Sequence, residues 1–219
     1  MWQLYGQEFF SLAVIHFLAV ILPGPDFLIT LQQSLKYGRK HGVITALGIG
    51  AGISVHVLYT LIGVAILFQT HAWLMASLQL LAAAYLCYLA RHCLASSTAP
   101  NTATLATATP SRVPSWQRSF LTGFFCNALN PKATIFFLAI FSSIVSPQTP
   151  LNIQIAYGAW MCSINALWFI VVSYIFTQQQ IRQKFLAYSC YIERIMGGLL
   201  MLIALRIGYV ALQSLCGTG

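Results

Sequence analysis

The sequence has very little charge, and acidic residues are its scarcest class. Only 6% of its 219 residues are charged, and Asp and Glu together number three. Residues 41–90 and 133–181 contain no Asp, Glu, Lys or Arg. In a soluble domain about a quarter of the residues are charged. The missing charge therefore excludes an ordinary soluble domain.

Hydrophobic residues take the place of the missing charge. They make up 58% of the chain, and the mean hydropathy is +0.77. Since about 20 apolar residues cross the hydrocarbon of a bilayer, each charge-free run holds two spans and a tight turn. The sequence predicts an all-α integral membrane protein with six transmembrane helices, at about residues 9–34, 43–67, 72–94, 118–145, 151–176 and 190–213.

One sizeable polar segment divides the chain. Residues 96–117 are rich in Ser, Thr, Ala and Pro, a composition typical of a flexible linker. We therefore expect a first three-helix half at 1–95, a cytoplasmic linker at 96–117 and a second three-helix half at 118–219.

Most of the basic residues behind the net charge of +8 lie between or beside the spans, and Arg206, near the outer end of the last span, is the exception to this pattern. They occupy alternate connections rather than one patch, which argues against nucleic acid as a partner and for a lipid bilayer. By the positive-inside rule these connections are cytoplasmic and both chain ends lie outside. The basic residues in question are Lys36, Arg39, Lys40, Arg91, Arg112, Arg118, Arg182 and Lys184.

The two halves resemble each other faintly. Laying Val20–Ile29 over Cys126–Ile135 matches Pro25 with Pro131 and Asp26 with Lys132. Three spans per half means that a repeat would be inverted across the membrane, an arrangement typical of secondary transporters.

Prolines interrupt the first and fourth predicted helices at matching places. Pro23, Gly24 and Pro25 lie within the first, and Asn130 and Pro131 lie within the fourth. Proline lacks an N–H and clashes with the preceding turn, so each helix must kink or unwind there. Carbonyls freed by such breaks must be buried in protein or line a wet cavity.

Asp26 and Lys132 directly follow these two breaks, near the middle of the membrane. A lone charge at that depth costs about 3 kcal/mol, so the two residues are natural partners. One interpretation is a static ion pair in helices bent only for packing. The other is a central site, in which Asp26 binds a substrate ammonium or a proton and Lys132 meets a carboxylate.

Further polar residues fall on the expected spans. Thr30 and Gln33 continue a polar stripe from Asp26 toward the cytoplasm. Neutral hydrogen bonds could come from Asn127, Asn130 and Asn165, although the first two could equally cap backbone groups freed by the break. His56 shares a helix face with several glycines, and it is either a satisfied core histidine or a substrate or proton site.

These motifs together resemble the LysE/RhtB family of amino-acid exporters. The similar segments are Leu22–Ala65, with Pro-Gly-Pro and a Gly-Arg-x-x-Gly loop, Leu80–Leu89, and Cys126–Phe141, with Asn-Pro-Lys-Ala. The positions that match the family motifs are Pro23, Gly24, Pro25, Asp26, Gly38, Arg39, Gly42, Asn130, Pro131 and Lys132. Gly38, Arg39 and Gly42 are expected in a cytoplasmic loop, with a role in orientation or gating.

The resemblance implies a six-helix carrier of the bacterial inner membrane that exports amino acids or close derivatives, driven by protons. Pro-Gly-Pro-Asp is similar to the threonine and homoserine-type subgroup. Partners would be the amino acid, protons and lipid, with a homo-oligomer left open, since Gly197 and Gly198 could pack between protomers or within one.

Other functional classes fit the sequence less well. An intramembrane aspartyl protease needs two membrane carboxylates where Asp26 stands alone, and the absence of Cys-x-x-Cys and His-Glu-x-x-His predicts no enzyme, metal or cofactor. A haem-binding electron carrier would use His16 and His56 as ligands. A metal-ion exporter would need more His, Cys and carboxylate groups than the spans contain.

Overall fold

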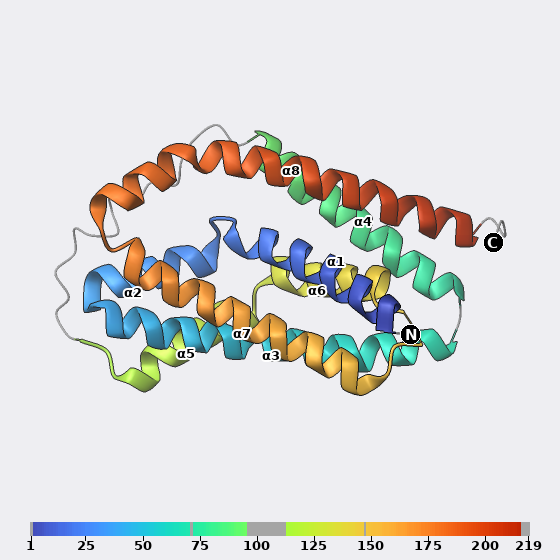
Figure 1. Cartoon of the computed structure of the whole chain (residues 1–219), viewed down its shortest axis with the longest axis horizontal. Helices are drawn as coiled ribbons and strands as arrows, with labels where there is room; N and C mark the ends of the chain where they lie inside the picture. The colour runs from blue at the N-terminus through green and yellow to red at the C-terminus, as the bar shows by residue number, and fades with distance from the viewer. Residues whose placement is uncertain (1, 71, 96–112, 147, 216–219) are drawn as a thin grey trace.

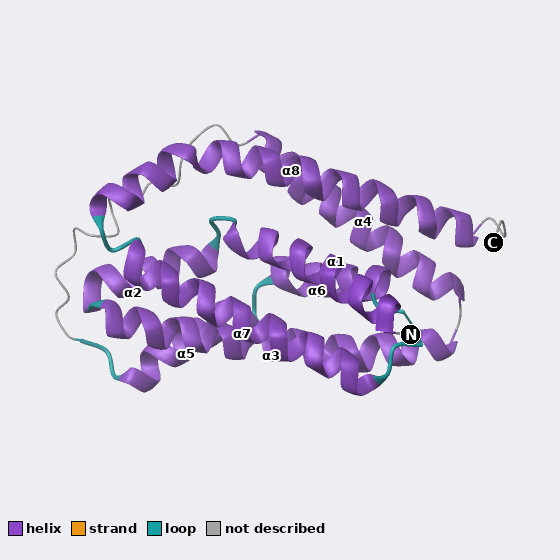
Figure 2. Ribbon diagram, in the orientation of Figure 1, coloured by secondary structure: helices purple, strands orange, loops and turns teal. Residues whose placement is uncertain are grey.

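The computed structural model describes residues 2–70, 72–95, 113–146 and 148–215, and these residues form helices and no strand (Figure 2). The predicted all-α fold is confirmed. Most of the expected linker at 96–117, and Cys216, lie outside the described residues. The helices are α1 (Trp2–Ile21), α2 (Pro25–Tyr37), α3 (Arg39–Thr70), α4 (Ala72–Ala95), α5 (Trp116–Ala128), α6 (Pro131–Ile144), α7 (Leu151–Ile175) and α8 (Gln179–Leu215).

Both predicted helix breaks are present. The pair α1 and α2 bends by 53° and the pair α5 and α6 by 56°. In each case a proline is the first residue of the second helix. An N–H at this position has no acceptor within the helix, so the proline costs no hydrogen bond. Asn130 caps α6, because its side-chain oxygen accepts the Lys132 N–H at 3.0 Å, whereas Gly24 caps α2 with no side chain.

Among the described residues, three helices are long and apolar enough to cross a membrane alone: α3, α7 and α8. The number is five if each bent pair forms one span. The chain is thus built as a multi-pass membrane protein. The remaining expected span, 72–94, corresponds to α4. This helix is not among the five, so its crossing of the membrane stays a prediction.

Two helix boundaries differ from the sequence-based expectation. The loop expected after the first span is reduced to Gly38, whose φ of 92° favours glycine, so Arg39 and Gly42 lie in the first turns of α3. Likewise α8 begins at Gln179, well before residue 190. Hydropathy marks where a helix leaves the membrane, whereas these helices continue as polar turns beyond it.

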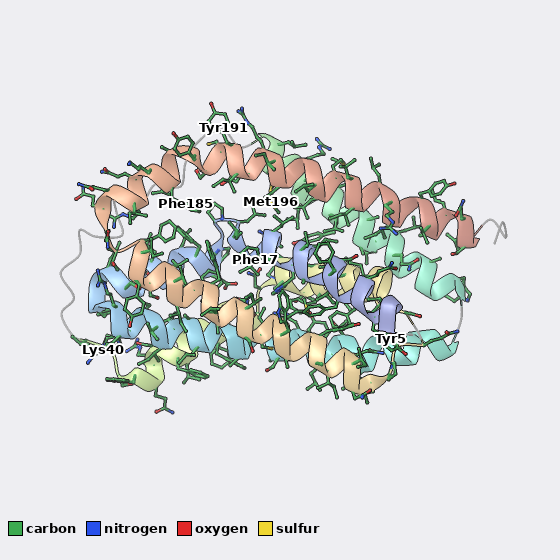
Figure 3. The ribbon with its side chains drawn as sticks, viewed as in Figure 1. Tyr5, Phe17, Lys40, Phe185, Tyr191 and Met196 are labelled. Atoms are coloured by element: carbon green, nitrogen blue, oxygen red, sulfur yellow. The ribbon has the colours of Figure 1, made fainter. Side chains whose placement is uncertain are left out.

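The bundle has a central helix and an outer pair (Figure 1). Helix α3 packs along α5, α7 and α2, while α4 and α8 pack along each other and meet the rest mainly through α6. Figure 3 shows Met196 on the inner side of α8 and Tyr191 on its outer side; their exposed fractions are 4% and 64%. The start of α1 and the end of α8 lie at one end of the molecule, opposite the α2–α3 and α7–α8 connections.

Glycines allow α3 and α5 to approach closely. A Cβ added at Gly48 would collide with the Phe120 carbonyl oxygen, and one at Gly123 with the Thr45 carbonyl oxygen. A Cβ at Gly52 would lie 2.9 Å from the Cβ of Asn127. These contacts place α5, and with it Asn127, directly against α3.

Replacing Gly48 by leucine is therefore expected to lower the thermal unfolding midpoint strongly or to prevent folding, because the collision is with rigid backbone. Gly63→Ala is the matched control on α3, since a Cβ there meets no described atom within 4 Å. Fluorescence-detected size-exclusion after heating in detergent measures both. Equal midpoints for the two variants would contradict this packing.

Candidate functional site

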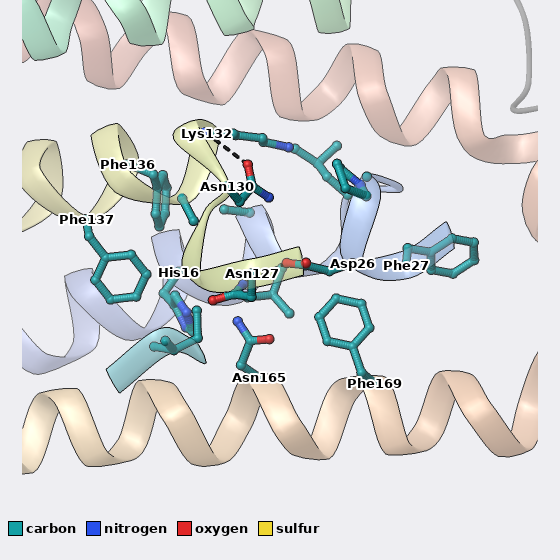
Figure 4. Close-up of a pocket in the computed structure, with 17 residues that line it drawn as sticks. His16, Asp26, Phe27, Asn127, Asn130, Lys132, Phe136, Phe137, Asn165 and Phe169 are labelled. Atoms are coloured by element: carbon teal, nitrogen blue, oxygen red, sulfur yellow. Dashed lines mark hydrogen bonds between the residues drawn. The ribbon is translucent and has the colours of Figure 1, made fainter. Parts of the chain in front are cut away.

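The two helix breaks meet at a cavity inside the bundle (Figure 4). Its lining comes from α1, α2, α3, α5, α6 and α7 and from the α1–α2 and α5–α6 breaks, and the volume is about 70 Å³. That volume holds a few water molecules but is far below the roughly 300 Å³ at which ligand pockets begin. The cavity must widen before it can take a substrate of amino-acid size. Its polar lining residues are His16, Asp26, Asn127, Asn130, Lys132 and Asn165.

Asp26 is the acid of this cavity. It lies in the first turn of α2, and its Oδ2 accepts a hydrogen bond of 2.8 Å from Asn127 Nδ2. The other carboxylate oxygen, Oδ1, is buried and receives no hydrogen bond from a described nitrogen or oxygen. The Cys126 thiol lies beside the carboxyl group. Asp26 therefore has an unfilled oxygen that can accept a cationic donor or hold a proton.

Lys132 lines the same cavity but does not pair directly with Asp26. The carboxylate is held by Asn127, and the Lys132 ammonium lies near the break in the other helix, 4.0 Å from a Cβ built at Gly24. In Figure 4 the labelled Asn130 lies between the two charged side chains. The static ion pair, one of the two interpretations of the sequence, is therefore not formed in this conformation, and the Lys132 ammonium lies beside Gly24, the N-cap of α2.

Lys132 instead faces the outer helix pair. Its electrostatic neighbours, besides Asp26, are Cys93 on α4 and Glu193 on α8. Sequence reasoning overlooked Glu193, although it is one of only three acidic residues. Two of the three acids of the chain, Asp26 and Glu193, thus act electrostatically on this lysine.

His16 lines the cavity from α1 and was left without a role by the sequence. Its side chain is 1% exposed, and within the described part of the chain neither ring nitrogen has a hydrogen-bond partner. The rings of Phe136, Phe137 and Trp160 surround it at centroid distances of 6.3, 5.9 and 5.9 Å. An ionisable residue inside a span is a signal of function that could have marked it.

His56 does not line the cavity but supports it. Its Nε2 lies 2.9 Å from the Asn127 carbonyl oxygen and its Nδ1 2.8 Å from the Tyr59 hydroxyl. Because a carbonyl only accepts, Nε2 must carry a hydrogen. The imidazole thereby anchors the backbone of Asn127, which in turn holds Asp26.

A family model for LysE type translocators matches residues 17–210, a range that contains both helix breaks and every polar residue of the cavity except His16. The chain belongs to the LysE type translocator family. It is therefore a membrane transporter and not an enzyme.

Named relatives of this translocator cover most of its length. It is 29% identical over 191 residues to the threonine efflux protein of Escherichia coli strain K12, covering 87% of this chain and 92% of the relative. It is 26% identical to the uncharacterized membrane protein YrhP of Bacillus subtilis strain 168, covering 86% and 92%. No solved structure matches.

Thr30 and Gln33 of the translocator lie away from the cavity. The Thr30 hydroxyl donates to the Asp26 carbonyl oxygen at 2.7 Å, a bond within α2 itself. Gln33 lines a separate hollow between α2 and the start of α5, together with Tyr37 and Arg118. The structure thus separates these two residues from the Asp26 cavity.

The Gly-Arg-x-x-Gly motif of the translocator joins three helices at the basic end. Arg39 Nε donates to Thr177 Oγ1 at 3.1 Å, and its guanidinium lies 6.0 Å from the Tyr174 ring centroid. A Cβ added at Gly42 would collide with the Ser34 hydroxyl and approach that of Ser173. The motif therefore ties α3 to α2 and α7.

The opposite end of the translocator is closed by a buried acid that sequence reasoning also overlooked. Glu8 is 6% exposed and accepts hydrogen bonds from the Thr149 hydroxyl at 2.8 Å and the Ser146 N–H at 3.0 Å. The Tyr157 hydroxyl lies 3.4 Å from the same carboxylate. Glu8 thus ties α1 to the α6–α7 connection.

Proposed function

We propose that this translocator exports amino acids or close derivatives, of the threonine, homoserine or homoserine-lactone type. The observation that carries the proposal is the unfilled Asp26 oxygen in a cavity where two broken helices meet. A substrate ammonium supplies the cationic donor that this carboxylate lacks. The relative named as a threonine efflux protein supports this choice of substrate class.

The other end of an amino acid would be received by Lys132. Its ammonium lines the same cavity as Asp26 and has no anionic partner bonded to it. The amino ends of α2 and α6, which begin at the two breaks, add partial positive charge to the same region. A zwitterion would therefore lie across the cavity between opposite charges.

The proposal includes six spans in two inverted three-helix halves. The broken pairs run in opposite directions, and α3 packs along α7 as α4 packs along α8, which supports matching halves (Figure 1). The basic residues of the α2–α3 and α7–α8 connections would face the cytoplasm of a bacterial inner membrane, with both termini outside.

The proposed cycle alternates access by rocking the halves around the cavity. Substrate enters from the cytoplasm and binds Asp26. After its release outside, a proton binds Asp26 and the carrier returns. The contacts of Arg39 and of Glu8 would then act as links that open at opposite ends in turn.

Counterflow in proteoliposomes tests the function. Vesicles loaded with unlabelled amino acid and holding the purified protein are expected to accumulate labelled threonine or homoserine above empty vesicles, and an acid exterior is expected to speed efflux. A panel with alanine, valine, lysine and glutamate defines the substrate class. No accumulation of any amino acid would refute the proposal, and efflux indifferent to the pH gradient would refute the proton coupling alone.

A further inference from the structure

We infer that His16 and Asn165 form the part of the site that selects a hydroxyl group on the substrate side chain. The inference rests on the proposed function, because it takes the main-chain ammonium of an amino acid to be at Asp26. It adds which side chains the carrier prefers and which residues distinguish them. The preferred substrate is a small amino acid with a short hydroxylated side chain.

The first observation is a set of unused polar atoms. Both nitrogens of His16 and the Oδ1 of Asn165 are buried and have no hydrogen-bond partner among the described residues, and the two side chains are 1% and 4% exposed. Both residues line the cavity that holds Asp26 (Figure 4). Buried polar groups in proteins are nearly always paired, so these atoms require a partner inside the cavity.

The second observation is that the unused atoms match one chemical group. A neutral imidazole offers one N–H donor and one acceptor, and the Asn165 Oδ1 is an acceptor. A hydroxyl both donates and accepts, so a substrate hydroxyl in the cavity can accept from the imidazole N–H or donate to the Asn165 oxygen. A methyl group in the same place would leave both protein groups unpaired and stripped of water.

The rest of this subsite is apolar. Phe136 and Phe137 line the cavity beside His16, and Trp160 contacts the imidazole edge-on. Such walls accept the carbon skeleton of a short side chain. They offer no carboxylate besides Asp26, so a cationic side chain would have no anionic partner there. Lysine and arginine are therefore expected to be poor substrates, while threonine, serine and homoserine fit.

The decisive comparison is threonine against valine, which have the same shape and differ by a hydroxyl for a methyl. Counterflow of each is measured in proteoliposomes with the wild type, His16→Leu, His16→Gln and Asn165→Leu. His92→Leu is the matched control, since His92 is an exposed histidine on α4 outside the cavity. Size-exclusion profiles compare the amounts of folded protein.

The wild type is expected to prefer threonine to valine. His16→Leu is expected to lower the threonine-to-valine ratio by about 10- to 100-fold, because the variant has no imidazole that threonine can pair with and valine leaves unpaired. His16→Gln, which keeps a donor and an acceptor, should retain part of the preference. Asn165→Leu should lower it, and His92→Leu should leave it unchanged.

Three results would overturn the inference. One is an unchanged ratio in His16→Leu and Asn165→Leu, and another is a parallel fall of threonine and valine. The third is loss of the response to a pH gradient with the ratio intact, which would make His16 a proton site instead.

If His16→Leu fails to fold, His16→Gln and Asn165→Leu decide. A wild type that carries no amino acid refutes the proposed function itself. If the wild type transports amino acids but the His16 and Asn165 substitutions leave the threonine-to-valine ratio unchanged, the inference alone is refuted.

Discussion

Asp26→Asn is expected to lower threonine counterflow by about 100-fold or more. The substitution removes the charge that the substrate ammonium needs, and a hydrogen bond to a charged group is worth about 1.5–3 kcal/mol even before the low polarity of the cavity is considered. The amide can still bond Asn127, which now holds the carboxylate at 2.8 Å, so the fold is expected to survive. Initial rates in proteoliposomes with matched protein content measure the effect.

Two further variants sharpen this result. Asp26→Glu keeps the charge on a longer side chain and should retain partial activity. Glu193→Gln removes the same charge from α8, outside the residues that line the cavity, and should have a much smaller effect. Nearly full proton-dependent export by Asp26→Asn would show that this carboxylate binds neither substrate nor proton.

Lys132→Met is expected to lower counterflow by about 10- to 100-fold, because the substrate carboxylate loses its charged partner. Lys184→Met is the matched control, since it removes an exposed lysine from the start of α8. The proposal also predicts that the double variant Asp26→Asn/Lys132→Met is inactive. If instead the double variant regains activity that both single variants lack, the two residues would form a structural ion pair and the substrate would bind elsewhere.

The helix breaks were predictable because proline acts locally. A missing N–H and a ring that clashes with the preceding turn interrupt a helix whatever surrounds it, and both breaks occur where Pro25 and Pro131 stand. The glycine-lined α3–α5 contact could also be expected in kind, since small residues allow helices to approach in a membrane. That α5 is the helix packed against these glycines could not be predicted, because the spacing of glycines does not show which helix they contact.

The partners of the charged residues could not be predicted from sequence. The sequence pairs Asp26 with Lys132 because an isolated charge in the membrane is costly. Whether Asn127 or Lys132 contacts the Asp26 carboxylate, however, depends on how the α5–α6 break orients these two side chains. His16 was visible as an ionisable residue within a span, yet only the fold shows that both nitrogens face a cavity without a partner. The sequence pointed to His56 rather than His16 as a substrate or proton site, but both nitrogens of His56 are already used in hydrogen bonds.

The small cavity and the Glu8 contacts suggest how the cycle is arranged. With about 70 Å³ available and α1 tied through Glu8 to Thr149 and Ser146, this conformation has no room for a substrate of amino-acid size. Widening requires movement at the breaks, where backbone hydrogen bonds are already interrupted and bending costs least.

The central claim is that the ammonium of an amino acid binds Asp26 in this cavity, and equilibrium binding of labelled threonine to purified protein tests it most directly. The proposal predicts saturable binding to the wild type that homoserine displaces and N-acetylthreonine, which lacks the ammonium, does not, with binding lost in Asp26→Asn. Equal threonine affinity in the wild type and Asp26→Asn, or displacement by N-acetylthreonine as effective as that by homoserine, would contradict it.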